Sequence, residues 1–230
     1  MIDPKLAQAQ YEKAAPTKAP AKPKTPKPEL LLPFAAHSLA GESRIESSTI
    51  HNMCAQDEDF ADLQVSKSVF AKCQFLDCHF ESAFFEDTIF EYCNFSTSTF
   101  PSAFFRRCVF KNCKLLGATF ADSLFNDVRI QESTLEFSTF AHARWKDVQF
   151  ANSNLASADL SDMQLTRIAL DTCNLVSASL FRTSLAGIDL TSCQLEGVVV
   201  SDAMSEVLGA KMDIYQAAIF ARRLGIVIAD

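Results

Sequence analysis

The sequence predicts an all-β solenoid, because two patterns recur together along most of its 230 residues. Every fifth residue from Ile45 to Val200 is apolar, at thirty-two consecutive positions without a slip of register. The residue two places before each of these central positions is usually small, as at Cys73, Ala83 and Ser98. A helix repeats near 3.6 residues and a strand at 2. A period of five therefore indicates a repeat architecture, in which each unit buries its apolar face only against its neighbours.

Each five-residue unit is expected to send two side chains inward. In an extended segment, residues i and i−2 point to the same side, so one large and one small side chain face the core. The other three residues face outward or form the turn. The small column leaves room for the large side chains, which are mostly Phe up to Phe150 and Leu from Leu155 to Leu195.

Four segments identify a known form of this repeat. The sequence resembles the pentapeptide-repeat family, whose pattern is A(D/N)LXX, at Ala158-Asp159-Leu160, Ser153-Asn154-Leu155, Cys173-Asn174-Leu175 and Cys93-Asn94-Phe95. The resemblance covers roughly residues 41–200. It implies a right-handed quadrilateral β-helix with four pentapeptides per coil, and therefore about eight coils. The number of sides comes from the family and not from the period.

With twenty residues per coil, equivalent central residues are expected to stack. One such stack consists of Phe60, Phe80, Phe100, Phe120 and Phe140. Trp145 stands where Phe is expected, and we interpret it as a core residue near the middle of the rod. Seven of the eight cysteines fall in the small inward column, where free Cys acts as a small apolar residue, and their number fits a reducing compartment. These seven are Cys73, Cys78, Cys93, Cys108, Cys113, Cys173 and Cys193, and only Cys54 lies off the column.

Several functional classes lack support in the sequence. No stretch of about eighteen apolar residues predicts a membrane span, and the N-terminus lacks the layout of a signal peptide. The four histidines are scattered, and no phosphate-binding loop or nucleophile motif is present. We therefore expect a cytoplasmic protein that is not an enzyme. No catalytic, cofactor-binding or metal-binding residue is predicted, and no cofactor.

Residues 1–33 are predicted to be a disordered Lys/Pro/Ala-rich tail, followed by the β-helix over residues 34–200. Seven of the eight prolines lie in this tail, with six lysines against three acidic residues, a composition typical of segments that cannot bury a core. Two interpretations stay open. The tail is a solvated spacer, or it is an electrostatic tether to DNA or to an acidic partner.

Residues 201–230 are predicted to form a C-terminal helix and a short strand. Asp213 and Gln216 have the spacing of a capping box, Gly225 can end the helix, and residues 226–228 can form the strand. The helix is apolar on more than one side, whereas a helix that only caps a rod needs one apolar stripe. We therefore expect it to cap the rod and to form a two-fold dimer interface. The candidate interface residues are Tyr215, Ala218, Ile219, Phe220, Leu224 and Ile226.

The C-terminal segment narrows the resemblance to one branch of the family. Tyr215-Gln216-Ala217-Ala218, Leu224-Gly225-Ile226 and the upstream Ala186-Gly187-Ile188-Asp189-Leu190 resemble the ending of Qnr-type quinolone-resistance proteins. This resemblance implies dimerisation through the C-terminal helices and binding to DNA gyrase, a type II topoisomerase. Qnr proteins of mobile elements interrupt their coils with loops, whereas this register is unbroken. The chain is therefore expected to inhibit gyrase more readily than to protect it.

The charge of the repeat suggests how such binding works. Residues 41–200 carry 21 acidic and 12 basic residues. Asp62, Asp122, Asp162 and Asp202 are expected to share one outward acidic column that binds the partner. The next column reads Lys67, Asp87, Arg107, Asp127, Asp147 and Arg167, and is expected to pair its own charges.

The predicted function is therefore a DNA-mimicking, non-enzymatic modulator of gyrase or another type II topoisomerase, with low-level quinolone resistance as a further expectation. The rod itself is not expected to bind nucleic acid directly, nor to bind a membrane. The alternative is a structural or interaction scaffold in which the rod is a spacer and the tail is a docking segment.

Overall fold

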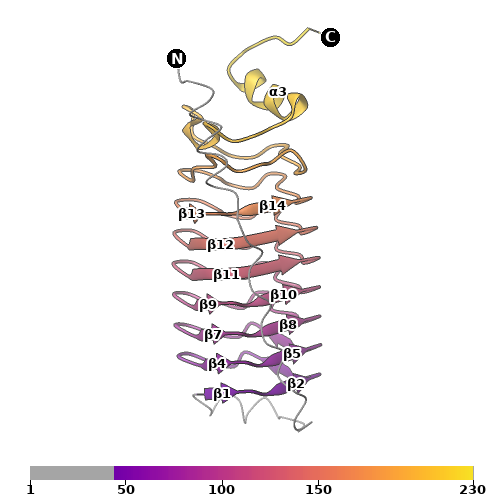
Figure 1. Cartoon of the computed structure of the whole chain (residues 1–230), viewed down its shortest axis with the longest axis vertical. Helices are drawn as coiled ribbons and strands as arrows, with labels where there is room; N and C mark the ends of the chain where they lie inside the picture. Colours follow the sequence, from indigo (N-terminus) through magenta and orange to yellow (C-terminus); the bar gives the residue numbers. More distant parts are fainter. Residues whose placement is uncertain (1–43, 230) are drawn as a thin grey trace.

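The structure, a computed structural model, describes residues 44–229. Short parallel strands lie one above another along a rod, and helix α3 (Ile214–Arg223) lies at its C-terminal end (Figure 1). Paired residues differ by twenty, as in Ile45 with Val65. Four pentapeptides therefore make one coil, which confirms the predicted quadrilateral solenoid. The predicted tail and the first ten residues of the predicted β-helix lie outside the described residues.

The pairing offset of twenty defines four sides of the rod. We call residues 44–48 the first side, 49–53 the second, 54–58 the third and 59–63 the fourth, each repeated every twenty residues. The first two sides form one twelve-stranded sheet, and the third begins as a two-stranded sheet.

The strands follow these sides. Those of the first side are β1 (Arg44–Glu46), β4 (Gln64–Ser66), β7 (Phe84–Glu86), β9 (Phe104–Arg106) and β13 (Gln164–Thr166). Those of the second side are β2 (Thr49–His51), β5 (Val69–Ala71), β8 (Ile89–Glu91), β10 (Val109–Lys111) and β14 (Ala169–Asp171). Two longer strands, β11 (Leu124–Gln131) and β12 (Arg144–Ala151), run across both sides, and the third side has β3 (Cys54–Gln56) and β6 (Gln74–Leu76).

The strand-bearing part of the rod is shorter than the expected eight coils. Six successive pairings lead from β1 to β13, so this part makes about six turns. Beyond Asp171 the register continues through isolated bridges such as Asn174 with Gln194. The regular strands end because the next coil pairs differently. The N–H groups of Leu185 and Gly187 donate to the carbonyls of Glu206 and Gly209, which lie more than twenty residues further along the chain.

The corners explain why the outward residues are so often Asp, Asn or Ser. The residue two places after a central position has left-handed backbone, as in Asp62 (φ 59°) and Asn152 (φ 49°). Asn and Asp tolerate this region better than most residues, and Gly117 (φ 64°) occupies one such corner without strain. The Asp62 N–H donates to the Glu81 carbonyl of the next coil at 2.8 Å, which ties each corner to its neighbour.

The large inward side chains form the predicted stacks. Successive rings of Phe60, Phe80, Phe100, Phe120 and Phe140 lie 4.9, 4.7, 4.8 and 4.8 Å apart between centroids. Rings on adjacent sides meet edge to face, a favourable arrangement for aromatic pairs. Trp145 is buried at 3% exposure, as predicted, although its Nε1–H has no hydrogen-bond partner among the described residues.

The small inward side chains do more than leave room. Ser98 donates to the Phe75 carbonyl at 2.8 Å and accepts from the Cys78 N–H at 3.0 Å, which joins two coils inside the core. The seven predicted inward cysteines are buried, and Cys54 is exposed. Burial raises the pKa of the Cys108 thiol to about 12. Such a thiol stays protonated at neutral pH and is a structural residue.

The C-terminal helix begins and ends as predicted, but the prediction of a strand after it is wrong. Asp213 and Gln216 form a reciprocal capping box, and Gly225 follows the helix with φ 78°. The Ile226 N–H donates back to the Ala221 carbonyl at 3.1 Å, which closes the helix end. Within the described residues, 226–229 form no strand, because the chain there meets no strand edge with which to pair.

Candidate partner-binding surfaces

The acidic residues of the rod are concentrated on two of its four sides. Over residues 44–200, the third and fourth sides together carry eleven acidic and two basic residues, whereas the first and second carry nine acidic and ten basic. The described rod is therefore nearly neutral on its first two sides and strongly negative on its last two. Sequence reasoning found one acidic column and missed this broader surface, because it counted charge over the whole repeat and along single columns, and not side by side.

Three of the four predicted acidic residues do lie in one corner column of the fourth side. Asp62, Asp122 and Asp162 occupy left-handed corners, and each donates its N–H to the next coil. Arg182, the next residue of the column, lies 3.7 Å from Asp162. The negative charge of Asp162 is thus partly offset, whereas Asp62 and Asp122 are exposed.

The prediction for Asp202 is wrong, because the column ends before it. In the regular pattern the corner N–H donates to the carbonyl nineteen residues ahead, as Asp162 does to Phe181, which for Arg182 would be residue 201. The Arg182 N–H instead donates to Glu206 Oε1 at 2.9 Å. Glu206 lies in the short helix η1 (Ser205–Val207) and is 2% exposed. Its other oxygen accepts from Ser201 Oγ at 2.8 Å. Burial by itself would raise the pKa of Glu206, but these hydrogen bonds outweigh it and the pKa is lowered.

Sequence reasoning missed Glu206 because nothing in its local pattern marks it. It is a buried carboxylate that replaces a backbone carbonyl and closes the last corner of the rod. Only the departure of the chain from the period of five after Val200 pointed to this region.

The neighbouring charged column pairs largely as predicted. Arg107 holds Asp87 through two hydrogen bonds of 2.6 and 2.7 Å, and Arg167 holds Asp147 in the same way. These bonds lower the pKa of both aspartates. Asp127 differs, because its buried Oδ1 has no hydrogen-bond partner in the described part of the chain and burial raises its pKa. The column thus neutralises most of its own charge.

The C-terminal helix presents some of the predicted interface residues and buries another. Phe220 is 7% exposed and belongs to the core, so its place on a free surface was wrong. Ile219 packs partly against the core, and Ala218 is half-buried. Tyr215, Leu224 and Ile226 are exposed. The helix therefore caps the rod with one stripe and leaves an apolar surface outside.

Gln216 fixes the helix to the rod. Besides its capping role, its Nε2 donates to the carbonyls of Leu190 and Cys193 at 2.7 Å each. Lys211 adds an ion pair to Asp189 at 2.6 Å, just before the helix. The orientation of the exposed surface is therefore set by the buried hydrogen bonds of Gln216 and by this exposed ion pair.

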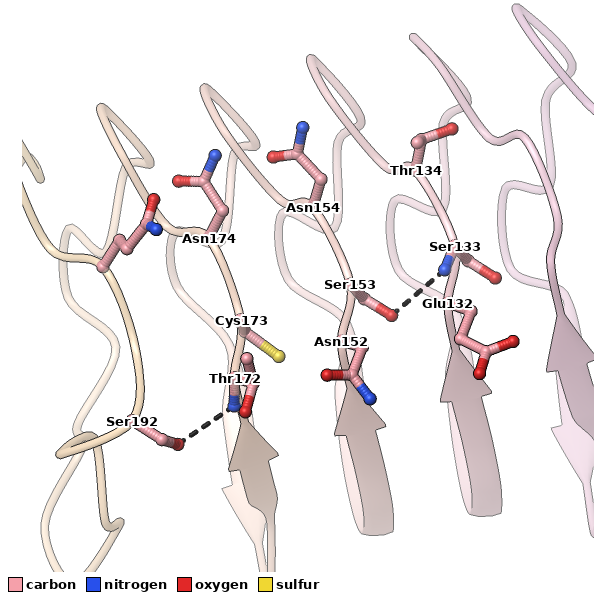
Figure 2. A pocket seen from close by; sticks show the side chains of 11 residues that line it. Glu132, Ser133, Thr134, Asn152, Ser153, Asn154, Thr172, Cys173, Asn174 and Ser192 are labelled. Atoms are coloured by element: carbon pink, nitrogen blue, oxygen red, sulfur yellow. Dashed lines mark hydrogen bonds between the residues drawn. The ribbon is translucent and has the colours of Figure 1, made fainter.

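A polar hollow of about 550 Å³ lies at the corner between the second and third sides (Figure 2). Asn154 and Asn174 project from successive coils, and their Oδ1 atoms accept from the backbone N–H groups of Ala156 and Val176. The remaining amide groups can donate hydrogen bonds outward. Glu132 is the one carboxylate that lines the hollow. The arrangement suits contact with a polar surface, and within the described residues no hydrogen bond joins the Glu132 carboxylate to a hydroxyl or thiol of the hollow.

Residues 44–229 contain neither a metal-binding cluster nor a membrane-spanning helix. No group of three His, Cys, Asp or Glu side chains there could hold a metal ion. No helix in this part of the chain has the length and apolar character needed to cross a membrane.

Part of the chain is similar to a family model, and the chain is similar to several solved structures. Residues 103–180 match the model of a pentapeptide repeat region. The chain is similar to trypsin-treated QnrB1, described as a plasmid-mediated fluoroquinolone resistance protein, with 21% identity, a TM-score of 0.45, and coverage of 79% of this chain and 100% of that one. Full-length QnrB1 has 23% identity and a TM-score of 0.44, with coverage of 84% of this chain and 94% of that one. HetL of the cyanobacterium Nostoc is a pentapeptide repeat protein involved in regulating heterocyst differentiation. It has 11% identity and a TM-score of 0.35, with coverage of 76% of this chain and 91% of that one. No curated protein sequence matches the chain.

Proposed function

We propose that the chain is a pentapeptide-repeat protein, as the match of residues 103–180 suggests, and that it is a non-enzymatic, DNA-mimicking modulator of DNA gyrase or a related type II topoisomerase. Low-level quinolone resistance is the proposed consequence. The observation that carries the proposal is the concentration of negative charge on the third and fourth sides. The likeness of the C-terminal segment to Qnr-type proteins directs it to gyrase.

The charge density of these two sides supports mimicry in magnitude. Their register runs from Cys54 to Gln194 in seven steps, which at about 4.8 Å each span about 34 Å. A net charge of −9 over that length is one negative charge per about 4 Å, against about 3.4 Å along one strand of duplex DNA and about 1.7 Å for its two strands together. The rod therefore resembles a single DNA strand in linear charge and can steer towards a basic DNA-binding surface.

A gyrase supercoiling assay, with and without a quinolone, tests this proposal. The wild-type chain should inhibit supercoiling at micromolar concentration, more weakly as salt rises. Neutralising the corner column with Asp62→Asn, Asp122→Asn and Asp162→Asn should raise the half-maximal concentration about tenfold. Asn suits the left-handed corners, so the fold should be kept.

The matched control neutralises three acidic residues on the second side, with Glu91→Gln, Glu132→Gln and Asp171→Asn. It changes the net charge equally but leaves the proposed surface intact, so inhibition should change little. An equal loss of inhibition in both triple variants would show that only the net charge of the chain matters, and not the proposed surface. No effect of the wild-type chain would favour the scaffold alternative.

The proposal includes a homodimer formed through the exposed surface of the C-terminal helix. Tyr215 is 82% exposed and Leu224 is 65% exposed, although both are large and largely apolar. Light scattering should give about twice the chain mass of 25.4 kDa, and Tyr215→Asp should give a monomer. Leu208→Asp is the control, because Leu208 is also exposed, at 68%, but lies outside the helix.

A further inference from the structure

An apolar stripe on the first side belongs to neither the core nor the acidic surface. Phe84, Phe104 and Leu124 occupy the same outward position in three successive coils, as the pairing of β7, β9 and β11 requires (Figure 1). The rings of Phe84 and Phe104 lie 5.3 Å apart between centroids, and Leu124 is exposed. Single apolar side chains on a surface are ordinary, whereas a contiguous stripe indicates a covered or binding surface.

The remainder of this column is polar. It reads Arg44 and Gln64 before the stripe, and Arg144 and Gln164 after it. The fold therefore accepts polar residues at this position, and the change to Phe and Leu is confined to the middle coils. Core packing cannot explain the change, because these side chains point away from the interior.

A hollow of about 190 Å³ lies at the near end of the stripe. Its apolar lining consists of Phe84 and Val65, and the rest of the lining is polar or charged: Arg44 (the first described residue), Glu46, Gln64, Ser66, Lys67 and Glu86. It is smaller than the roughly 300–1,000 Å³ of typical small-molecule sites, which favours side chains of a polypeptide as its occupant. The hollow links the stripe to the point where the described chain begins.

We propose that the apolar segment Leu30–Phe34 of this same chain covers the stripe. The segment reads Leu-Leu-Leu-Pro-Phe and lies outside the described residues, ten residues before Arg44. Ten residues can span about 33 Å, whereas Phe84 lies two coils, or about 10 Å, from Arg44. A segment tethered at that distance acts at millimolar effective concentration, which favours it over a second copy at micromolar concentration.

Photo-crosslinking of the full-length chain tests this assignment. A benzoylphenylalanine in place of Leu31 should crosslink within one chain to peptides that contain Phe84, Phe104 or Leu124, as mapped by mass spectrometry. Combining the label with Phe84→Gln and Phe104→Gln should lower the yield of these crosslinks about tenfold. Gln occurs at this position in two other coils, so the rod should keep its circular dichroism and melting temperature.

Several results would overturn the assignment. Crosslinks that join two chains would show that a second copy covers the stripe. Crosslinks scattered over all four sides would show that the stripe is not a docking surface. An unchanged yield in the double variant would do the same. If the double variant misfolds, Leu30→Ser, Leu32→Ser and Phe34→Ser provide the same test without altering the rod. None of these readouts involves gyrase.

Discussion

Replacing Glu206 with Ala should loosen the last coil of the rod while leaving its middle unchanged. Glu206 is 2% exposed and accepts hydrogen bonds from the Arg182 N–H at 2.9 Å and from Ser201 Oγ at 2.8 Å. Hydrogen bonds to a charged group contribute about 1.5–3 kcal/mol each. Ser201 is only half-buried, so its hydroxyl can find water when the carboxylate is removed.

The Arg182 N–H then accounts for most of the cost, because it loses its bond to a charged group, and we expect Glu206→Ala to lower the free energy of opening the last coil by about 2–3 kcal/mol. In a solenoid each coil contacts only its neighbours, so the loss should stay local. The amides of Leu185 and Gly187, which donate to the Glu206 and Gly209 carbonyls, should report it.

Hydrogen exchange measured by mass spectrometry distinguishes local from global loss. Exchange at residues 182–190 should rise about thirtyfold or more, while peptides around Phe100 stay protected. Glu196→Ala is the matched control, because Glu196 is exposed on the third side. Equal exchange in both variants, or equal loss of protection along the whole rod, would refute the reasoning.

The same carboxylate gives a signed pH dependence. Its folded pKa is lowered below the ordinary value of 4.5, so its stabilisation is complete above that value and is lost as pH falls through the folded pKa. Wild-type protection of the last coil should therefore decline in acid more steeply than that of Glu206→Gln. A parallel decline in both would assign the acid sensitivity to other carboxylates.

Three further changes test the core, the cap and an unpaired charge. Phe100→Ala removes one ring of a continuous stack and should cost about 3–5 kcal/mol in urea unfolding; a cost below 1 kcal/mol would contradict the packing described. Gln216→Met removes two buried hydrogen bonds and should free the helix at a cost of about 2 kcal/mol, seen as helix exchange without loss of the rod. Asp127→Asn should stabilise the rod by about 1 kcal/mol at pH 7. Because burial raises the pKa of Asp127, that gain should vanish towards pH 4, where thermal unfolding of the two proteins should coincide.

The interior of the rod could be predicted almost completely from the sequence. A period of five determines which side chains face inward, and an offset of twenty determines which of them stack. The Phe60 to Phe140 stack and the buried cysteines follow from these two numbers. Only the number of sides needed knowledge of the family, and pairs such as Ile45 with Val65 now determine it directly.

The end of the rod could be predicted only in part, because its contacts are not periodic. The capping box of Asp213 and Gln216 is a local pattern and was correct. Which apolar stripe of the helix faces the rod depends on the path of residues 201–212, and that path places Phe220 inside. The same change of path put Glu206 where a continued period would have put residue 201, and it excluded Asp202 from the acidic column.

The distribution of ion pairs determines where the negative charge of the rod can act. On the first side, Arg107 and Arg167 engage Asp87 and Asp147 at 2.5 to 2.7 Å, so these carboxylates contribute little field beyond their own column. Unlike these, Asp122 on the fourth side is exposed and adds its full charge to the surface. The two kinds of acidic residue should therefore separate in experiment, with Arg107→Ala changing stability and Asp122→Asn changing the effect on gyrase. The net charge of −7 counts both kinds of acidic residue alike. In the fold, the paired carboxylates stabilise the rod, whereas the exposed ones form the proposed partner-binding surface.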